Sequence, residues 1–519
     1  MLKKKMIGLI CSLITSILLF PSISVFASES KSVTGTYDIV VEGFDWGPGV
    51  TKAIVTLDKQ VSNVTKDMFN VKEIKNWFQG IQSFDRTVIN AYTSDDEGSR
   101  VEIPSKYITI ELSVNPNEGS PFLYNFQSGF NTWSDPYSLN ITLAEGSELK
   151  VGEDTVSELN ITNEYINRQT PTIDKFKEEI YNAEGDISMK YSYYEPDTNT
   201  DKKPLIIWLH GAGEGGSDTT INTLGNEVGA LIESNIQSQF GGAYVLAPQS
   251  PTMWMDIGGS NYTSDGSTIY LESLMNLIKN YVNMNKDIDT NRIYIGGCSN
   301  GGFMTMALIL ENPEYFAAAY PICEAFSDSW ITEDKLNGIK DLPIWFTYSI
   351  NDPVVDPLGT SVATINRLKN INAKDVKVSQ FNNVVDTSGL YKDEEGNLYE
   401  YNGHWSWIYA FNDECKDGEE NLWSWLAKQE KNSIVDEPTD NHNDDNNTTQ
   451  EPDNDDSTDN SSGDTTNKLE DDKNIVKDNL NTINKVDKLP NTGDILSSKF
   501  FILIGLISTI VGIKMKFNK

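Results

Sequence analysis

The stretch Gly297-Cys298-Ser299-Asn300-Gly301 decides the fold of the larger part of this 519-residue chain. It has the pattern Gly-x-Ser-x-Gly and comes directly after the apolar run Arg292-Ile293-Tyr294-Ile295. A strand followed by a sharp turn, with glycine on both sides of a serine, lifts the serine hydroxyl clear of the sheet edge. The five-residue motif alone arises by chance in long chains, but this context makes Ser299 the candidate nucleophile.

Cys298 is the alternative nucleophile at the same turn. In that frame the motif becomes Gly296-Gly297-Cys298-Ser299-Asn300, in which the second glycine is missing. Because the sharp turn needs small residues on both sides of the nucleophile, the pattern favours Ser299 over Cys298.

A serine hydroxyl needs a base to take its proton, and the chain has only three histidines. His442 lies in a long acidic polar stretch that cannot form a rigid site. His210 ends an apolar run and begins a glycine-rich loop, so we expect it to organise the loop that holds the oxyanion. His404 remains as the predicted base, and it follows Ser299 in the order that this fold class requires.

The third member of a triad is a carboxylate between the nucleophile and the base. The buried strand predicted over 342–348 is followed by Ser349-Ile350-Asn351-Asp352-Pro353-Val354-Val355-Asp356. Asp352 lies at the exit of that strand and is the predicted acid, with Asp356 as the alternative. An aspartate before proline is also common in ordinary turns. The joint order of strand, elbow, strand, acid and late histidine favours the catalytic interpretation.

Strands alternate with helices around these residues, which predicts an α/β-hydrolase fold with a mainly parallel sheet covered on both faces. The expected strands are 205–209, 243–246, 292–295, 317–322, 343–348 and 376–381. The expected helices are 271–284, 304–310, 360–368 and 420–428.

The preceding part of the chain has a different pattern. Short runs with apolar residues on one face occur at 53–57, 107–112 and 137–143, separated by turn residues and without long helices. This density of strands predicts an immunoglobulin-like β-sandwich.

Both ends of the chain carry targeting signals. A basic start, an apolar stretch and small residues before position 28 indicate a secretory signal peptide. The other end carries Leu489-Pro490-Asn491-Thr492-Gly493, an apolar run and three lysines. This arrangement resembles the sorting signal of Gram-positive surface proteins, in which a sortase would cut between Thr492 and Gly493. The apolar run, 500–513, is short for a membrane span, which needs about 20 residues.

A spacer separates the folded part from the sorting signal. Residues 432–488 hold 16 acidic side chains against five lysines and few large apolar residues, so they cannot bury enough surface to fold. Its acidic run 453–457 lacks the turn glycine and closing glutamate of a calcium loop. We therefore expect five segments: signal peptide 1–27, β-sandwich 28–168, α/β-hydrolase domain 169–431, spacer 432–488 and sorting signal 489–519.

The composition limits the expected partners, disulfides and cofactors. The formal net charge is −35, and no basic cluster occurs outside the two terminal signals, so nucleic acid is not expected as a partner. Three cysteines remain after removal of the signal peptide, Cys298, Cys323 and Cys415, which allow one disulfide at most. No metal or organic cofactor is expected.

Four motifs together resemble bacterial EstA-type carboxylesterases, which carry an immunoglobulin-like domain before an α/β-hydrolase domain. The motifs are Trp208-Leu209-His210-Gly211-Ala212-Gly213-Glu214-Gly215-Gly216, Ala247-Pro248-Gln249-Ser250-Pro251, the elbow with Gly302, and Tyr401-Asn402-Gly403-His404-Trp405-Ser406-Trp407. The resemblance implies the same triad of Ser299, Asp352 and His404. It also implies that oxyanion donors come from the backbone N–H groups of Gly211, Ala212 and Asn300.

The predicted function is a cell-wall-anchored serine carboxylesterase that acts on short to medium acyl chains, with sortase and peptidoglycan as partners. Trp254, Trp405 and Trp407 are candidates for lining a substrate pocket, or for packing the loop that carries His404. Two alternatives are a peptidase of the prolyl-oligopeptidase type and a surface adhesin with a vestigial hydrolase domain. The sandwich could bind a carbohydrate or another surface ligand, or cover the active site.

Overall fold

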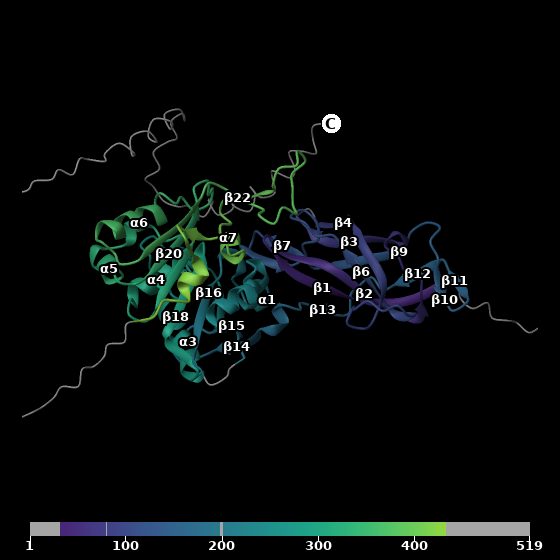
Figure 1. Cartoon of the computed structure of the whole chain (residues 1–519), viewed down its shortest axis with the longest axis horizontal. Helices are drawn as coiled ribbons and strands as arrows, with labels where there is room; N and C mark the ends of the chain where they lie inside the picture. Colours follow the sequence, from purple (N-terminus) through teal and green to yellow (C-terminus); the bar gives the residue numbers. More distant parts are fainter. Residues whose placement is uncertain (1–31, 79, 198–200, 432–519) are drawn as a thin grey trace, which may run out of the picture. The chain divides into compact units, whose positions relative to one another are not determined.

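The computed structural model describes residues 32–78, 80–197 and 201–431 of the chain (Figure 1). The predicted signal peptide, spacer and sorting signal, with His442, Thr492 and Gly493, lie outside the described residues. Within the described part, a region of strands precedes a region in which strands alternate with helices. The predicted order of the two fold classes is confirmed.

The first region is a sandwich of two sheets. One sheet has the order β12-β1-β2-β6-β5, with β13 also pairing with β1. Its strands are β12 (Glu158–Ile161), β1 (Ser32–Phe44), β2 (Gly47–Val61), β6 (Ser105–Leu112), β5 (Val88–Ser94) and β13 (Arg168–Gln169). The other sheet contains β4 (Gly80–Arg86), β3 (Phe69–Trp77) and β9 (Tyr137–Leu143) in that order. Alternate residues of both sheets point inward and form one apolar core, which includes Val55, Ile108 and Leu139.

Two hairpins extend from the sandwich. One is formed by β10 (Leu149–Val151) and β11 (Asp154–Val156), and the other by β7 (Phe122–Asn125) and β8 (Phe130–Trp133). Phe122 and Trp133, at the base of the β7–β8 hairpin, belong to an apolar cluster of the second region. Trp133 also packs against the core of the sandwich, so the β7–β8 hairpin lies between the two apolar cores.

The second region is built on an eight-stranded sheet of order β14-β15-β17-β16-β18-β19-β20-β21. The strands are β14 (Lys177–Tyr181), β15 (Met189–Tyr194), β17 (Tyr244–Gln249), β16 (Lys203–Leu209), β18 (Ile288–Cys298), β19 (Ala318–Ile322), β20 (Ile344–Ser349) and β21 (Val376–Phe381). From β17 to β21 all neighbours are parallel, whereas β14 and β15 form an antiparallel edge.

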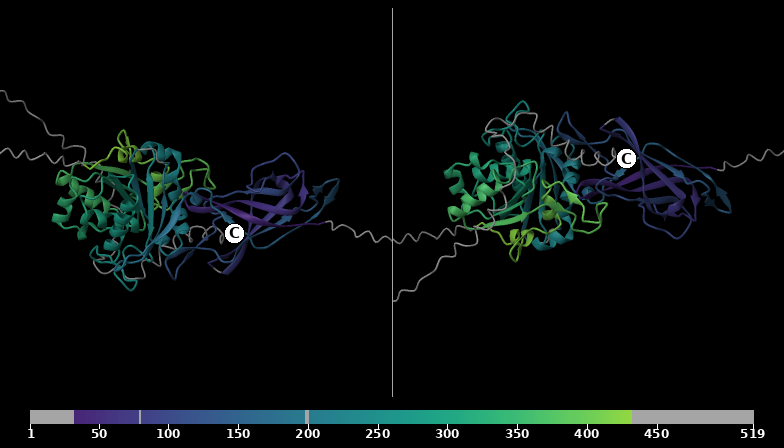
Figure 2. Two further views of the ribbon diagram at one scale, coloured as in Figure 1. Left: turned by 90° about the horizontal axis from the view of Figure 1, so that it is seen from below. Right: turned by 90° about the horizontal axis from the view of Figure 1, so that it is seen from above.

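Helices cover both faces of this sheet (Figure 1 and Figure 2). One face packs against α3 (Leu271–Met284), α4 (Asn300–Glu311), α5 (Glu333–Gly338) and α6 (Ser361–Asn370). The other face packs against α1 (Thr219–Gly225), α2 (Ser234–Phe240), α7 (Trp407–Phe411) and α8 (Leu422–Leu426).

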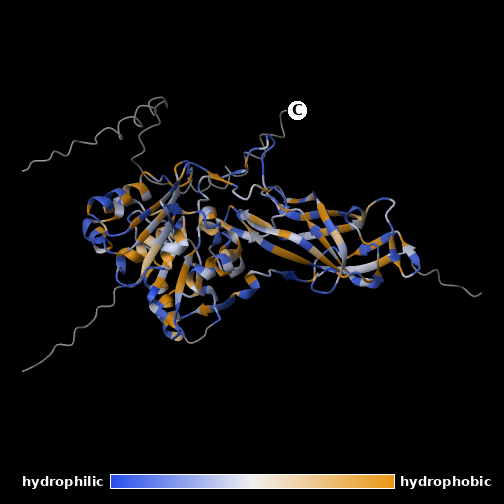
Figure 3. Cartoon of the chain, viewed as in Figure 1, coloured by the Kyte–Doolittle hydropathy of each residue, from blue (hydrophilic) through white to orange (hydrophobic). Residues whose placement is uncertain are grey.

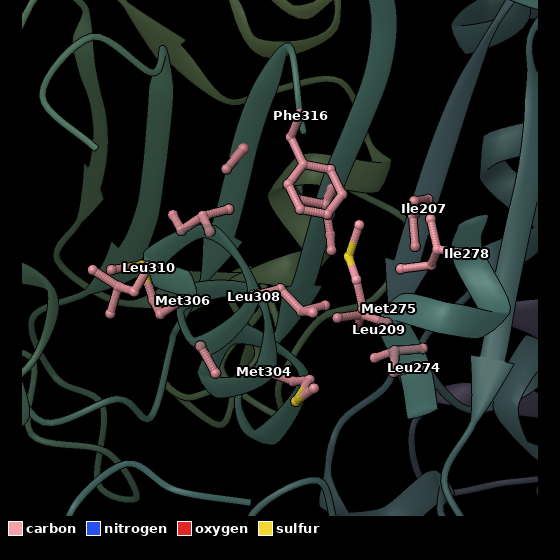
Figure 4. Packing of buried hydrophobic residues seen from close by; sticks show 14 of the residues in the cluster. Ile207, Leu209, Leu274, Met275, Ile278, Met304, Met306, Leu308, Leu310 and Phe316 are labelled. Carbon is pink, nitrogen blue, oxygen red and sulfur yellow. The ribbon is translucent and has the colours of Figure 1, made fainter. Parts of the chain in front are cut away.

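Successive residues of β16 explain the two apolar layers. Ile207 and Leu209 point into the layer of α3 and α4, whereas Ile206 and Trp208 point into the layer of α1 and α2. Figure 4 shows Ile207 and Leu209 beside Ile278 and Met275 of α3. A strand buried on both faces is apolar throughout, and the hydropathy view of Figure 3 shows orange strands between the helices of this region.

Several predicted elements have the expected bounds, and others differ for local reasons. α3, β9 and β21 cover the residues predicted for them. The helix predicted from residue 420 begins only at Leu422, because Glu420–Asn421 forms β25 with β24 (Lys416–Asp417). Asn421 then caps the helix, since its side-chain oxygen accepts from the N–H groups of Trp423 and Ser424.

Candidate active site

Ser299 lies at a strained turn between β18 and α4. Its φ of 55° and ψ of −114° are unusual for a residue with a side chain. A Cβ at Gly297 or at Gly301 would overlap the carbonyl oxygen of Leu209, at the end of β16. The two glycines of the motif therefore allow the turn to lie against the neighbouring strand, which is the nucleophile-elbow geometry that the sequence predicts.

The imidazole of His404 contacts the carboxylate of Asp352. His404 Nδ1 lies 2.7 Å from Asp352 Oδ2, and the two side chains are 9% and 2% exposed. The other carboxylate oxygen of Asp352 accepts from the N–H groups of Val354 and Val355, at 2.8 and 3.0 Å. These bonds orient the carboxylate, and the contact assigns the proton of the neutral imidazole to Nδ1, leaving Nε2 free to accept.

The alternative acid, Asp356, is exposed. Its Oδ1 accepts from the N–H of Leu358, within its own turn. Of the two aspartates that follow β20, Asp352 is therefore the one that meets a histidine.

The buried thiol of Cys323 links the three loops. Burial raises the pKa of this thiol well above its usual range, and the Asp352 carboxylate raises it further. The Ser299 backbone and the Ser406 side chain, which lie near the thiol, act in the opposite direction. Ser406 is two residues after His404, so the structure brings the loops of Ser299, Asp352 and His404 together around one side chain.

Both ring nitrogens of His210 form hydrogen bonds within the protein. Its Nε2 accepts from the N–H of Ser250 at 3.1 Å, so Nδ1 carries the proton and donates to the Gly211 carbonyl at 2.6 Å. Burial lowers the pKa of His210 to about 4, which keeps the ring neutral. With both nitrogens engaged, His210 holds the loop after β16, as the sequence analysis expects.

Ala212 and Asn300, two of the predicted oxyanion donors, each lie at the start of a helix. Ala212 is the first residue of the 3₁₀ helix η3 (Ala212–Glu214), and Asn300 is the first residue of α4. N–H groups in the first turn of a helix have no acceptor within that helix. Both helices begin where β16 and β18 end, and these two strands are neighbours in the sheet.

Gly211 lies beside the Glu214 carboxylate and the Cys298 thiol. It acts on the Glu214 carboxylate and on the Cys298 thiol, lowering the pKa of each, although burial raises both pKa values overall. Of the two predicted donors in this loop, Ala212 is thus the better placed for a substrate oxyanion. The thiol of Cys298 is fully buried behind the turn, which gives a physical reason to favour Ser299 as the nucleophile.

The three tryptophans predicted near the site differ in exposure. Trp254 is fully buried, donates from Nε1 to the His210 carbonyl at 3.2 Å, and packs on the His210 ring. Trp407 is buried with its ring edge toward His404, whereas Trp405 is half-buried against Tyr401 and Trp407. Trp254 therefore supports the loop of His210, and Trp405 is the one that keeps an accessible surface.

Cys298, Cys323 and Cys415 are free, buried thiols. Across the described ranges, no group of three or more histidine, cysteine or acidic side chains is arranged to hold a metal ion. No helix among those same residues is long and apolar enough to cross a bilayer.

Sequence analysis missed two side chains of the sandwich that reach this region. Asp45, in the turn between β1 and β2, accepts from Tyr401 and from Asn412, each at 3.1 Å. Asn131 in β8 donates to the carboxylate of Glu214 at 2.9 Å. Each of these contacts joins residues more than 80 positions apart. Neither Asp45 nor Asn131 lies in a recognisable motif, so the local sequence gave no indication of them.

The fold and the elbow define a class of protein, an α/β hydrolase preceded by an immunoglobulin-like domain. Residues 196–388 match the family described as phospholipase/carboxylesterase, and residues 36–158 match the esterase Ig-like N-terminal domain. Each of the two folded domains is thus similar to a domain known from esterases, the first to their Ig-like domain and the second to the phospholipase/carboxylesterase domain.

Known relatives agree with this assignment. A solved structure described as a thermostable esterase superposes with a TM-score of 0.59 and 26% identity, covering 77% of this chain and all of the other. A poly(3-hydroxybutyrate) depolymerase of Ralstonia pickettii is 31% identical over 131 residues, which are 24% of this chain and 25% of that protein. The chain therefore spans about a quarter of the length of this curated relative.

Proposed function

We propose that the protein is a secreted serine carboxylesterase, anchored to the cell wall, that hydrolyses esters of short to medium acyl chains. The observation that carries the proposal is the contact between His404 and Asp352 in a domain whose elbow presents Ser299. In this proposal the three residues form the catalytic triad.

Acylation begins when Ser299 Oγ attacks the carbonyl carbon of the ester and its proton moves to His404 Nε2. Asp352 stabilises the imidazolium that forms, because it already accepts from Nδ1. The negative oxygen of the tetrahedral intermediate accepts from the N–H groups of Ala212 and Asn300. As the intermediate collapses, the C–O bond to the alcohol breaks, and His404 gives its proton to the leaving alkoxide.

Deacylation repeats these steps with water. His404 takes a proton from water, the hydroxide attacks the acyl-enzyme, and the second intermediate releases the carboxylic acid while Ser299 regains its proton. Each step uses only protons and nucleophiles that the triad and water supply.

Ester hydrolysis by Ser299 is tested with p-nitrophenyl butyrate and octanoate, a short oligomer of 3-hydroxybutyrate, and an anilide of butyric acid. The oligomer is included because a relative is described as a poly(3-hydroxybutyrate) depolymerase. We expect the full chain to cleave the esters and Ser299→Ala to lose about 10³-fold or more in kcat, since the attacking atom is removed.

The anilide separates esterase from peptidase activity. Anilide turnover comparable with ester turnover would favour the peptidase alternative. A folded wild-type chain that cleaves none of these compounds would contradict the proposed function and favour the adhesin alternative. The same contradiction follows if Ser299→Ala retains the wild-type rate.

The proposed location rests on the sequence of the chain's two ends. We expect a Gram-positive host that expresses the full chain to hold the esterase in its wall fraction, from which a muramidase releases it. Because sortase joins Thr492 to peptidoglycan in this proposal, Thr492→Ala should lower the wall-bound fraction at least tenfold. An unchanged wall fraction in the variant would contradict anchoring at Thr492 without affecting the proposed chemistry.

A further inference from the structure

The β7–β8 hairpin of the immunoglobulin-like domain is fixed to the hydrolase domain at its base. Trp133 Nε1 donates to Thr220 Oγ1 in α1 at 3.1 Å, and Phe122 packs against Trp133 with its ring edge. The guanidinium of Arg168 covers the Trp133 ring at 3.5 Å from its centre. A hydrogen bond, an aromatic contact and a cation–π contact at the base thus orient the rest of the hairpin.

The hairpin meets the loop after β16 in a close approach that glycines permit. A Cβ at Gly213 would lie 2.9 Å from Asn131 Nδ2, and one at Gly215 would lie 2.8 Å from the Phe130 ring. On the hairpin side, a Cβ at Gly129 would lie 3.1 Å from the Met253 methyl group. Hairpin and loop are therefore in direct contact over several residues.

Asn131 makes the polar contact of this surface. Its Nδ2 donates to Glu214 Oε1 at 2.9 Å, and the Glu214 side chain is 5% exposed. The backbone of Gly211 and of Glu214 lowers the pKa of the same carboxyl, and the Glu214 carbonyl accepts from Gln249 Nε2 at 2.9 Å. Glu214, two residues after Ala212, is thus bonded through its carboxylate to the hairpin and through its carbonyl to Gln249 at the end of β17. We assign the Ala212 N–H to the oxyanion.

We propose that Asn131 is a positioning residue for ester hydrolysis: by holding the Glu214 carboxylate, it fixes the loop that presents the Ala212 N–H to the oxyanion. This inference rests on the proposed function. It gives the immunoglobulin-like domain a part in the chemistry, because the oxyanion loop is fully restrained only when the hairpin is docked.

The ionisation of Glu214 makes the positioning role of Asn131 measurable, because Asn131 affects the pH at which the carboxyl ionises. Burial raises the pKa of Glu214 to about 7, and the Asn131 amide lowers it by donating to the ionised form. The other titratable groups facing the carboxylate are Tyr124, from the same hairpin, and Cys298, behind the loop. His210, the histidine at the start of the loop, stays neutral above pH 5 because its pKa is about 4. Loss of the amide should therefore raise the pH at which Glu214 ionises.

The direction of the pH effect depends on which protonation state of the Glu214 carboxyl holds the loop. The ionised carboxylate accepts from Asn131 more strongly than the neutral acid does, so the restrained loop gains population as the pH rises through about 7 in the wild type. In Asn131→Ala this rise moves to higher pH. In Glu214→Gln it disappears.

The experiment measures kcat and KM of the full chain on p-nitrophenyl butyrate from pH 5.5 to 9. For Asn131→Ala we expect kcat at pH 7 to fall about tenfold with KM within twofold, since the oxyanion forms only in the transition state. The acid limb of its kcat profile should shift upward by about half a pH unit or more. Adding Glu214→Gln to Asn131→Ala should cost little beyond the larger single effect.

Thr132→Val is the matched control. Thr132 Oγ1 donates to the Leu123 carbonyl within the hairpin, so this variant perturbs the hairpin next to Asn131 without touching Glu214. We expect its pH profile to match the wild type even if its melting temperature falls. If Asn131→Ala keeps the wild-type kcat and pH profile, or changes only as Thr132→Val does, the inference is wrong while the proposed function stands. A wild type without Ser299-dependent turnover contradicts both.

Discussion

Asp352→Asn is expected to lower kcat by about 10³- to 10⁴-fold, with little change in KM. The asparagine would fill the same space, but its side chain can present an N–H to His404 Nδ1 where the carboxylate accepts at 2.7 Å. The imidazole would then carry its proton on Nε2 and could not receive the proton of Ser299. The imidazolium would also lose the negative charge that stabilises it. Steady-state kinetics on p-nitrophenyl butyrate measures both effects.

Asp356→Asn is the matched control for this prediction. Asp356 has the same side chain, lies four residues later in the same loop, and is exposed. We expect its kcat to stay within twofold of the wild type. Equal losses in the two variants, or a larger loss in Asp356→Asn, would contradict the assignment of Asp352 as the acid.

The sequence was sufficient for the elements whose physical causes are local. The apolar run that forms β16 is buried on both faces, so its strand could be predicted from composition. α3 has an amphipathic repeat over its whole length, and its predicted bounds agree with the structure. The elbow could be predicted because a strand, two glycines and a serine occur together, and the structure shows the close approach to Leu209 that requires those glycines.

Elements with weak or mixed patterns could not be predicted. The edge strands β14 and β15 are short, and the exposed residues of β14, such as Glu178 and Glu179, hide its strand pattern. β15 is positioned in the sheet by its antiparallel pairing with β17. That pairing joins residues distant in the sequence, so the local pattern does not predict it. The tryptophans illustrate the same limit, because residue type alone did not distinguish buried Trp254 from half-buried Trp405.

The contacts of the candidate site that come from the other domain depend on tertiary structure alone. Asn131 and Asp45 are ordinary polar residues of turns and strands in the sequence. The structure places Asn131 on the loop of Glu214, and Asp45 on Tyr401, three residues before His404. Burial and the nearby Asp45 charge then raise the pKa of Glu227 to about 8, an effect that only the packed interface can produce. The triad candidates could be predicted from sequence motifs. The contacts that the other domain makes with their loops follow only from the three-dimensional structure.

Gly301→Ala is expected to have the second large effect, on folding and activity together. A Cβ at this position would overlap the carbonyl oxygen of Leu209 and would lie 2.6 Å from the carbonyl oxygen of His210. Both are backbone atoms, which cannot move aside as a flexible side chain can. The helix α4 would have to separate from the end of β16, so we expect a destabilisation of about 3 kcal/mol or more.

The same displacement would move the two oxyanion donors apart, because Asn300 precedes Gly301 and Ala212 follows the end of β16. We therefore expect kcat to fall at least about 10²-fold in the fraction that folds, since misplaced donors stabilise the oxyanion poorly. Thermal unfolding followed by circular dichroism should show a melting temperature lower by roughly 5 to 10 °C.

Gly338→Ala is the control for a glycine without this constraint. Gly338 ends α5, is exposed, and a Cβ there would meet only the Pro313 ring at 4.0 Å. Alanine is the better helix former, so this variant should keep the wild-type kcat and a melting temperature equal or slightly higher. If Gly301→Ala behaves like Gly338→Ala in both measurements, the elbow does not lie against β16 as described. The strain at Ser299 would then have no supporting contact, and the geometric basis for the nucleophile would fail.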